Sequence, residues 1–215
     1  KNLLTKSMED TLLKASSVCV LFIGIGGAMS QMLKITDGAL ITSGSMMLII
    51  CFVLGGLVGE LLNIEGAFER FGAWLRKKTH NESDSGFLSG FIHASLTVCI
   101  GAMAIVGSIQ DGLLGDASLL CAKAALDAVI ILVMTVSMGK GCIFSAIPVA
   151  ILQGGVTLLS RVIAPVMTDA AIASLSFTGS VMIFCVGVNL IWGKTIKVAN
   201  LLPTLVFAVV YTFLF

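Results

Sequence analysis

Charged residues are scarce in this sequence. Only 12% of its 215 residues are Asp, Glu, Lys or Arg, whereas 57% are hydrophobic, and soluble domains are nearer a quarter charged. The few charges cluster between long apolar runs. A soluble protein of this length must cover its surface with charge. The composition therefore excludes a soluble domain and predicts an integral membrane protein.

Other absences exclude whole classes of function. The net charge is only +1 and no basic stripe is interleaved with aromatics, so no nucleic-acid partner is expected. The sequence has no CxxC pair, no His at zinc-ligand spacing, no nucleophile–base pair and no phosphate-binding loop, so we expect neither a metal, a cofactor nor an enzyme. His93 stands alone in an apolar run and is interpreted as a packing residue. Six cysteines lie within apolar runs and are interpreted as small buried hydrophobes: Cys19, Cys51, Cys99, Cys121, Cys142 and Cys185.

What is abundant is apolar sequence in long runs. A helix needs about 20 apolar residues to cross a bilayer, because its backbone amides must all be paired internally. Seven runs are long enough, at residues 14–34, 37–60, 84–111, 117–138, 140–161, 169–194 and 198–215. They predict an all-α polytopic bundle of about seven transmembrane helices, organised as a single transmembrane domain over residues 1–215.

The segment between the second and third runs differs in character. Over residues 64–78, Ile64, Phe68, Phe71 and Leu75 recur at helical spacing among charged residues, which predicts an interfacial amphipathic helix. A polar loop then extends to residue 86. If the basic part of this segment, residues 70–78, is cytoplasmic, alternation leaves only Lys34 and the arginine at 161 outside. The bias of Lys and Arg toward the cytoplasm favours this orientation.

Two kinds of glycine motif repeat along the chain. Gly-Gly pairs occur at residues 55–56 and 154–155, and each precedes a run with an Ile-Gly or Val-Gly pair. The second and third runs therefore resemble the fifth and sixth, and an odd spacing of three runs would insert them upside down. We expect an inverted repeat on this basis. The alternative is that small residues only let membrane helices pack closely.

Lys123 and Asp127 are the only charges inside an apolar run. They lie four residues apart, so their side chains share a helix face. Each costs roughly 2.5–3.5 kcal/mol at a helix centre on insertion scales, so the pair must face protein or water. Two interpretations stay open at this point: an ion pair that only orients the helix, or part of a polar pathway.

Amides and one further carboxylate fall inside or at the ends of other runs. They are Gln110 and Asp111, Gln153 beside a Gly-Gly pair, Asn189 after a Val-Gly pair, and Asn200 before Leu-Leu-Pro. Amides and glycines together in a membrane segment suggest locally opened helices whose carbonyls bind ions or solute. A single amide more often bonds to a neighbouring helix. Together with Lys123 and Asp127, these residues form the candidate pathway.

Several of these motifs resemble a known family. The run Gly-Ser-Ile-Gln-Asp-Gly at residues 107–112 and the run Ala-Asn-Leu-Leu-Pro at residues 199–203 are similar to those of the bacterial membrane proteins known as domain of unknown function 554, and the resemblance covers essentially the whole chain. Ala102 stands where the family tends to have proline, which weakens the case for a bend there. Family members usually begin with one further Gly-Gly-type helix, so the resemblance implies about eight spans in the intact protein. It also implies a bacterial inner-membrane location and transport.

Two functions from different classes follow. The first is a small secondary transporter or channel for an ion or small polar solute across the bacterial inner membrane. The second is a non-transporting assembly or interaction subunit whose buried charges are structural. The expected partners are the lipid bilayer, the solute and, through the glycine faces, a second copy of the chain.

Overall fold

The computed structural model describes residues 6–36, 38–80, 85–99 and 102–214, and these residues are almost entirely helical. The prediction of a helical bundle is confirmed, with one short hairpin as the exception. The elements are α1 (Lys6–Met32), β1 (Leu33–Thr36), β2 (Ala39–Thr42), α2 (Ser45–Leu62), α3 (Ile64–Lys78), α4 (Phe87–Cys99), α5 (Ala102–Leu114), α6 (Ser118–Met138), η1 (Lys140–Ser145), α7 (Ala146–Leu158), α8 (Ser160–Ile163), η2 (Ala164–Val166), α9 (Asp169–Trp192), η3 (Val198–Leu201) and α10 (Pro203–Leu214).

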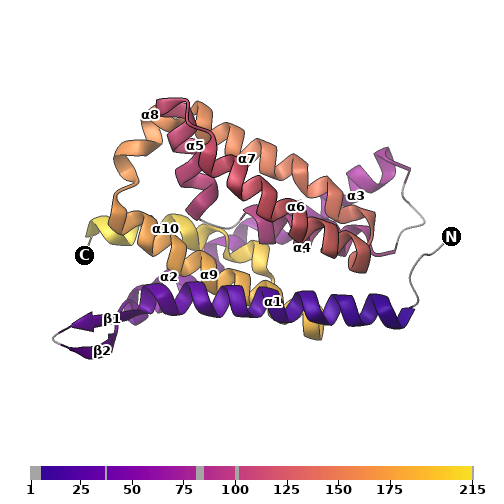
Figure 1. Ribbon diagram of the computed structural model, residues 1–215, viewed down its shortest axis with the longest axis horizontal. Coiled ribbons are helices and arrows are strands. Elements are labelled where there is room, and N and C mark those ends of the chain that lie inside the picture. The colour runs from indigo at the N-terminus through magenta and orange to yellow at the C-terminus, as the bar shows by residue number, and fades with distance from the viewer. Residues whose placement is uncertain (1–5, 37, 81–84, 100–101, 215) are drawn as a thin grey trace.

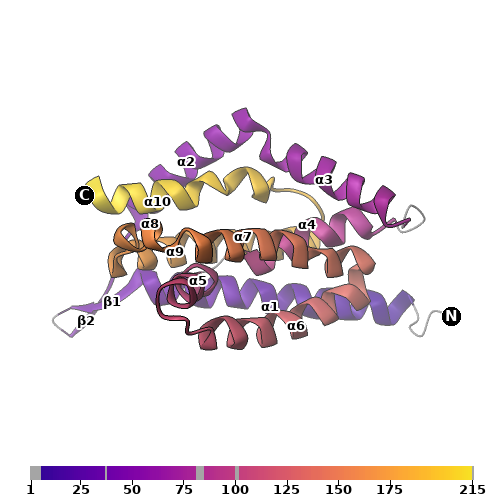
Figure 2. The same ribbon diagram turned by 90° about the horizontal axis from the view of Figure 1, so that it is seen from above.

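The long helices alternate in direction along the molecule. In Figure 1, α1, α4, α7 and α10 run from right to left, and α2, α6 and α9 run the other way. The right half therefore holds the start of α1, the whole of α3, η1 and the link from α9 to η3, and with them most of the Lys and Arg residues. We call this side the basic end. The opposite end holds the hairpin, α8 and the C-terminus (Figure 2).

Four helices are long and apolar enough to cross a membrane: α2, α6, the continuous stretch of η1 and α7, and α9. The bent pair α4 and α5 would make a fifth. The apolar part of α1 (Ser17–Met32) and the segment Val198–Leu214 are shorter. The structure is thus that of a membrane protein, and the expected number of seven spans is not confirmed.

The second apolar run was predicted wrongly at its start. The strands β1 and β2 pair antiparallel, with Leu33 opposite Thr42 and Thr36 opposite Ala39, and α2 begins only at Ser45. The sequence between them is Asp-Gly, which is a strong hairpin signal between apolar segments. A count of apolar residues does not reveal the hairpin, because Ile35, Leu40 and Ile41 suit a strand as well as a helix.

The third run is bent. α4 ends at Cys99 and α5 begins at Ala102, and the two helices differ in direction by 61°. The helix breaks here although Ala102 stands where the family tends to have proline. The absence of proline therefore did not mean the absence of a bend. Residues 100 and 101 lie outside the described residues.

Close backbone packing joins α1 to α9 and α2 to η3. A Cβ added at Gly24 would lie 2.7 Å from the Cα of Phe184, and one added at Gly59 would overlap the backbone carbonyl of Asn200. Only glycine lets these helices approach so closely. The second contact matters for function, because it holds η3 against the end of α2.

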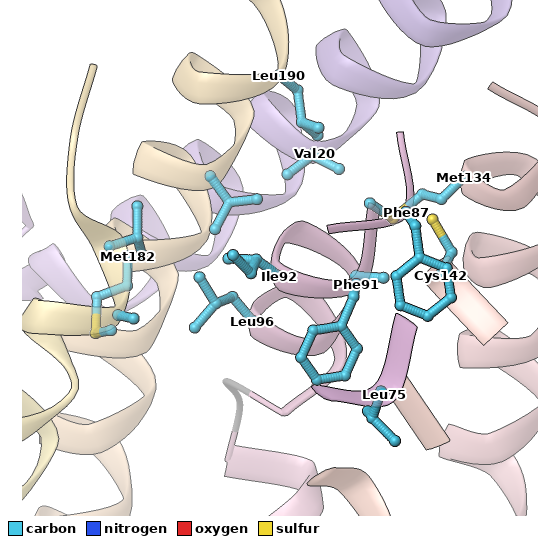
Figure 3. Close-up of a cluster of buried hydrophobic side chains, with 14 residues drawn as sticks. Val20, Leu75, Phe87, Phe91, Ile92, Leu96, Met134, Cys142, Met182 and Leu190 are labelled. Carbon is cyan, nitrogen blue, oxygen red and sulfur yellow. The ribbon is translucent and has the colours of Figure 1, made fainter. Parts of the chain in front are cut away.

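The amphipathic helix α3 spans Ile64–Lys78, as predicted, and its apolar face packs against protein. Leu75 is buried, and the ring of Phe71 lies 5.9 Å from that of Phe91 on α4. Figure 3 shows the core that it joins, with side chains from α1 (Val20), α3 (Leu75), α4 (Phe91) and α9 (Leu190). Packing α3 on α4 also places the acidic residues of α3 beside the end of α9.

Candidate functional site

Two of the seven candidate residues, Asn189 and Asn200, lie at the basic end where α3, α9 and η3 meet. Asn189 is buried near the end of α9, and its Oδ1 accepts hydrogen bonds from the backbone nitrogens of Thr195 (3.0 Å) and Ile196 (2.9 Å). Its Nδ2 donates to the carbonyl of Ile196 at 2.7 Å. One side chain therefore holds the reversal of the chain between α9 and η3.

Asn200 joins η3 to both α2 and α3. Its Oδ1 accepts a hydrogen bond from the backbone nitrogen of Glu65 at 2.7 Å, and its Nδ2 donates to Oε2 of Glu60 at 2.6 Å. Glu65 also bonds to η3, because its Oε2 accepts a hydrogen bond from the backbone nitrogen of Ala199 at 3.1 Å. Asn200 is only 3% exposed, so its amide bonds to protein and not to water. These reciprocal bonds fix the position of the Glu65 carboxylate.

Two lysines complete the cluster. Lys194 Nζ pairs with Glu69 and lies 3.1 Å from Oε1 of Glu65, and Lys197 Nζ lies 2.5 Å from Oε1 of Glu60. The hydrogen bond to Glu69 raises the pKa of Lys194 above its ordinary value, with a smaller contribution from Glu65. The Glu65 side chain is 8% exposed, whereas that of Lys194 is 48% exposed. The carboxylate is thus the fixed, buried partner and the ammonium the accessible one.

A cavity of about 320 Å³ opens between α3, α4 and α9. Its polar wall contains Glu65, Glu69, Ser89, His93, Asn189 and Lys194, and the rest is formed mainly by apolar side chains such as Ile92, Leu96, Leu190 and Val198. We call it the polar cavity. Its lining extends along α4 from Leu88 to Leu96, which is about 12 Å at 1.5 Å per residue. It therefore extends from the basic end toward the centre of α4.

His93 lies inside this cavity and not in dry packing. Its Nδ1 lies 2.8 Å from the carbonyl oxygen of Ser89, and since a carbonyl can only accept, Nδ1 carries the proton. Nε2 is then a bare acceptor, and it has no hydrogen-bond partner in the part of the chain that the structure describes. The residue is only 8% exposed. The buried His93 therefore lines the same cavity as the two carboxylates.

Lys123 and Asp127 form the expected ion pair, but elsewhere. Lys123 is 7% exposed, and its Nζ also donates to the carbonyl oxygen of Val98 at 2.8 Å. That carbonyl belongs to the last turn of α4, where the break before α5 leaves it without a helical donor. A cation at a helix C-terminus is also favoured by the helix dipole. The pair lies outside the polar cavity and supports the break between α4 and α5.

The remaining candidates are not brought to the cluster. Gln110 lines a separate and mostly apolar hollow of about 220 Å³ between α5 and the start of α9. Asp111 follows it on α5, and Gln153 is partly buried on α7. The helices α5 and α7 are continuous at all three residues, so the expected opening of the helices at these amides is not seen. The seven candidates thus occupy several places instead of one site.

Six ionisable residues of the cluster and the polar cavity were not among the predicted site residues. They are Glu60, Glu65, Glu69, His93, Lys194 and Lys197. Of these, Glu65 and Glu69 belong to the predicted amphipathic helix, and His93 was interpreted as a packing residue. The one available signal was the four-residue spacing of Glu65 and Glu69, which places two carboxylates on the same helix face. Among the described residues, no group of three or more His, Cys, Asp or Glu residues is arranged to hold a metal ion.

Comparison with known proteins places the chain in a family. It is 26% identical over 205 residues to the uncharacterized membrane protein YdfK of Bacillus subtilis, covering 95% of this chain and 83% of that protein. It is 27% identical over 168 residues to the uncharacterized protein YqgA of Escherichia coli, covering 75% and 70% of the two chains. No solved structure matches. The family model described as protein of unknown function (DUF554) matches residues 1–213, and the chain therefore belongs to the DUF554 family of membrane proteins.

Proposed function

We propose that this protein is a small secondary transporter or channel for an ion or small polar solute, and that it is not an enzyme. The observation that supports this best is the polar cavity. Placing the Glu65 carboxylate, whose side chain is 8% exposed, and His93 inside an otherwise apolar molecule is costly unless they are paired or hydrated. Cavities of roughly 300–1,000 Å³ with a few convergent polar groups are typical of binding sites for small molecules.

On this proposal the chain is one transmembrane domain that crosses the bacterial inner membrane seven times. The segments alternate in direction (Figure 1), and most Lys and Arg residues belong to the elements of the basic end, which agrees with a cytoplasmic basic end. The shorter segments, in α1 and from η3 into α10, would then be spans as well. The lipid bilayer and the solute are the proposed partners, with no role for nucleic acid.

We retain the inverted repeat and a homodimer as parts of the proposal. α2 and α7, which carry the Gly-Gly pairs at residues 55–56 and 154–155, run in opposite directions in Figure 1, as inversion requires. Superposing α2 and α4 on α7 and α9, after rotation about an axis in the membrane plane, tests the repeat. The outer face of α7 at Gly154 and Gly155 has open space around it, which leaves room for a second copy to pack closely.

The second candidate function is the assembly subunit, and one observation favours it. The ammonium of Lys123 bonds to Asp127 and to the carbonyl of Val98, so this charge pair has a structural role at the break between α4 and α5. The site residues first proposed on α6 therefore argue for packing, whereas the polar cavity argues for transport.

Flux into proteoliposomes distinguishes the two functions. The assay compares the parent chain with Glu65→Gln, using panels of monovalent and divalent ions, amines, amino acids and sugars. Glu60→Gln is the matched control, because Glu60 belongs to the same hydrogen-bond network but does not line the polar cavity. We expect flux of at least one solute to be lost in Glu65→Gln and kept in Glu60→Gln. Background flux for the whole panel, or equal flux in both variants, would contradict transport through this cavity.

A further inference from the structure

We infer that the polar cavity binds a small organic cation, a primary ammonium on a short apolar chain, and that the ammonium of Lys194 occupies this binding position in the structure. The inference deepens the proposed function by naming a class of solute. Its test measures binding, so its outcome does not depend on whether flux is found.

The charge of the cavity selects a cation. Two carboxylates, Glu65 and Glu69, face a single ammonium, Lys194, and the bare Nε2 of His93 adds an acceptor and no charge. An anion would meet two carboxylates within the wall. An ammonium has three donors and no acceptor, so it suits a group of acceptors of this kind.

The apolar part of the wall selects an organic body over a metal ion. A hard metal ion takes about six or more oxygen ligands. The polar cavity offers two carboxylates, the Ser89 hydroxyl and the His93 ring, and the oxygen of the Asn189 amide already accepts three hydrogen bonds. Ile92, Leu96 and Leu190 form much of the remaining surface and cannot coordinate an ion. They suit the carbon chain of an amine.

Lys194 is itself a model of such a ligand. Its side chain is an ammonium on four methylene groups, and it reaches both carboxylates from the chain reversal after α9. Because its side chain is 48% exposed, it can leave toward water when another ammonium enters. Glu65 cannot follow it, since its Oε2 is held by the backbone nitrogen of Ala199 and its own backbone by Asn200. The ammonium of Lys194 then competes with the ammonium of a free solute for the two carboxylates.

The first experiment measures binding of n-butylammonium chloride to the purified full chain by calorimetry, with sodium chloride at equal ionic strength and sodium butyrate as controls. Lys194→Ala removes the competing ammonium. We expect the Lys194→Ala variant to bind n-butylammonium about tenfold more tightly than the parent. This factor corresponds to a parent site that Lys194 leaves vacant about a tenth of the time. Lys197→Ala is the matched control, because its partner Glu60 lies outside the polar cavity. It should bind like the parent, and butyrate should not bind.

A second measurement needs no variant and guards against misfolding of Lys194→Ala. Acetylation of the parent chain by a membrane-impermeant amine reagent is followed by peptide mass spectrometry, and the ratio of modified Lys194 to modified Lys197 is recorded. Displacement by n-butylammonium should raise this ratio, and sodium chloride should leave it unchanged. The inference is overturned if the ratio does not respond, or if Lys194→Ala binds n-butylammonium no more tightly than Lys197→Ala does.

Discussion

The side-chain oxygen of Asn200 lies 2.7 Å from the backbone nitrogen of Glu65, across 135 residues of sequence. This bond joins the short helix before α10 to the first turn of the amphipathic helix. It satisfies a nitrogen that has no partner within its own helix, as every helix start requires. Because the Glu65 side chain also bonds back to residue 199, the two segments fix each other and the wall of the polar cavity.

Replacing Asn200 should therefore weaken the whole basic end. Asn200→Ala leaves the backbone nitrogen of Glu65 without its acceptor and Glu60 without one donor. A buried polar group left unpaired costs about 1–3 kcal/mol, and we expect a clearly lower melting temperature in detergent. Asn63→Gly is the control, because it removes only the cap on Gly66 and keeps the positive φ of 48° accessible. A melting temperature as high in Asn200→Ala as in Asn63→Gly would show that the bond is not structural.

Two glycines should respond in opposite ways to alanine. At Gly59 the new methyl group would collide with the backbone of Asn200, so α2 and η3 must separate and the polar cavity must distort. At Gly154 the methyl group meets nothing within 4 Å, and alanine favours a helix by about 1 kcal/mol over glycine. Thermal unfolding should show Gly59→Ala destabilised and Gly154→Ala unchanged or stabilised. The reverse order would contradict the packing of α2 on η3.

Lys123 should matter more for stability than Asp127. Lys123→Met removes the donor to Val98 and leaves Asp127 as an unpaired charge, and breaking a buried pair costs roughly 3–5 kcal/mol. Asp127→Asn keeps the bond to Val98 and should cost less. The double variant Lys123→Met with Asp127→Leu removes both charges but still leaves a bare carbonyl, so a loss of about 1–3 kcal/mol is expected. Chemical unfolding of the three variants checks this order, and a double variant as stable as the parent would contradict the role of Lys123 at the helix break.

Orientation in the membrane is tested by cysteine labelling from outside intact cells. Ser85→Cys lies just before α4, and Ser118→Cys begins α6. The native cysteines are first replaced by serine, because Cys19 and Cys121 are exposed and Cys121 lies within one helical turn of position 118. With the basic end in the cytoplasm, an impermeant maleimide should label the cysteine at position 118 and not the one at position 85. Labelling at position 85 alone would reverse the proposed topology.

Much of the architecture was predictable because membranes impose simple rules on sequence. Apolar runs are read directly as helices, and the repeat of Ile64, Phe68, Phe71 and Leu75 predicted α3 with its bounds. The hairpin and the bend were not predicted. A strand and a helix can be built from the same apolar residues in a short run. The lysine that donates a hydrogen bond to the carbonyl of Val98, beside the break between α4 and α5, comes from another helix.

The sequence by itself determined that this chain is a helical membrane protein of the DUF554 family, that Lys123 pairs with Asp127, and that Asn189 and Asn200 are polar residues of consequence. For Lys123 and Asp127, spacing along one helix is enough, because side chains three or four residues apart share a helix face. Only the tertiary structure decided where the cavity lies and which charges it contains. Glu65, His93 and Lys194 come from three segments, and no local pattern records that helix packing places their side chains around one cavity.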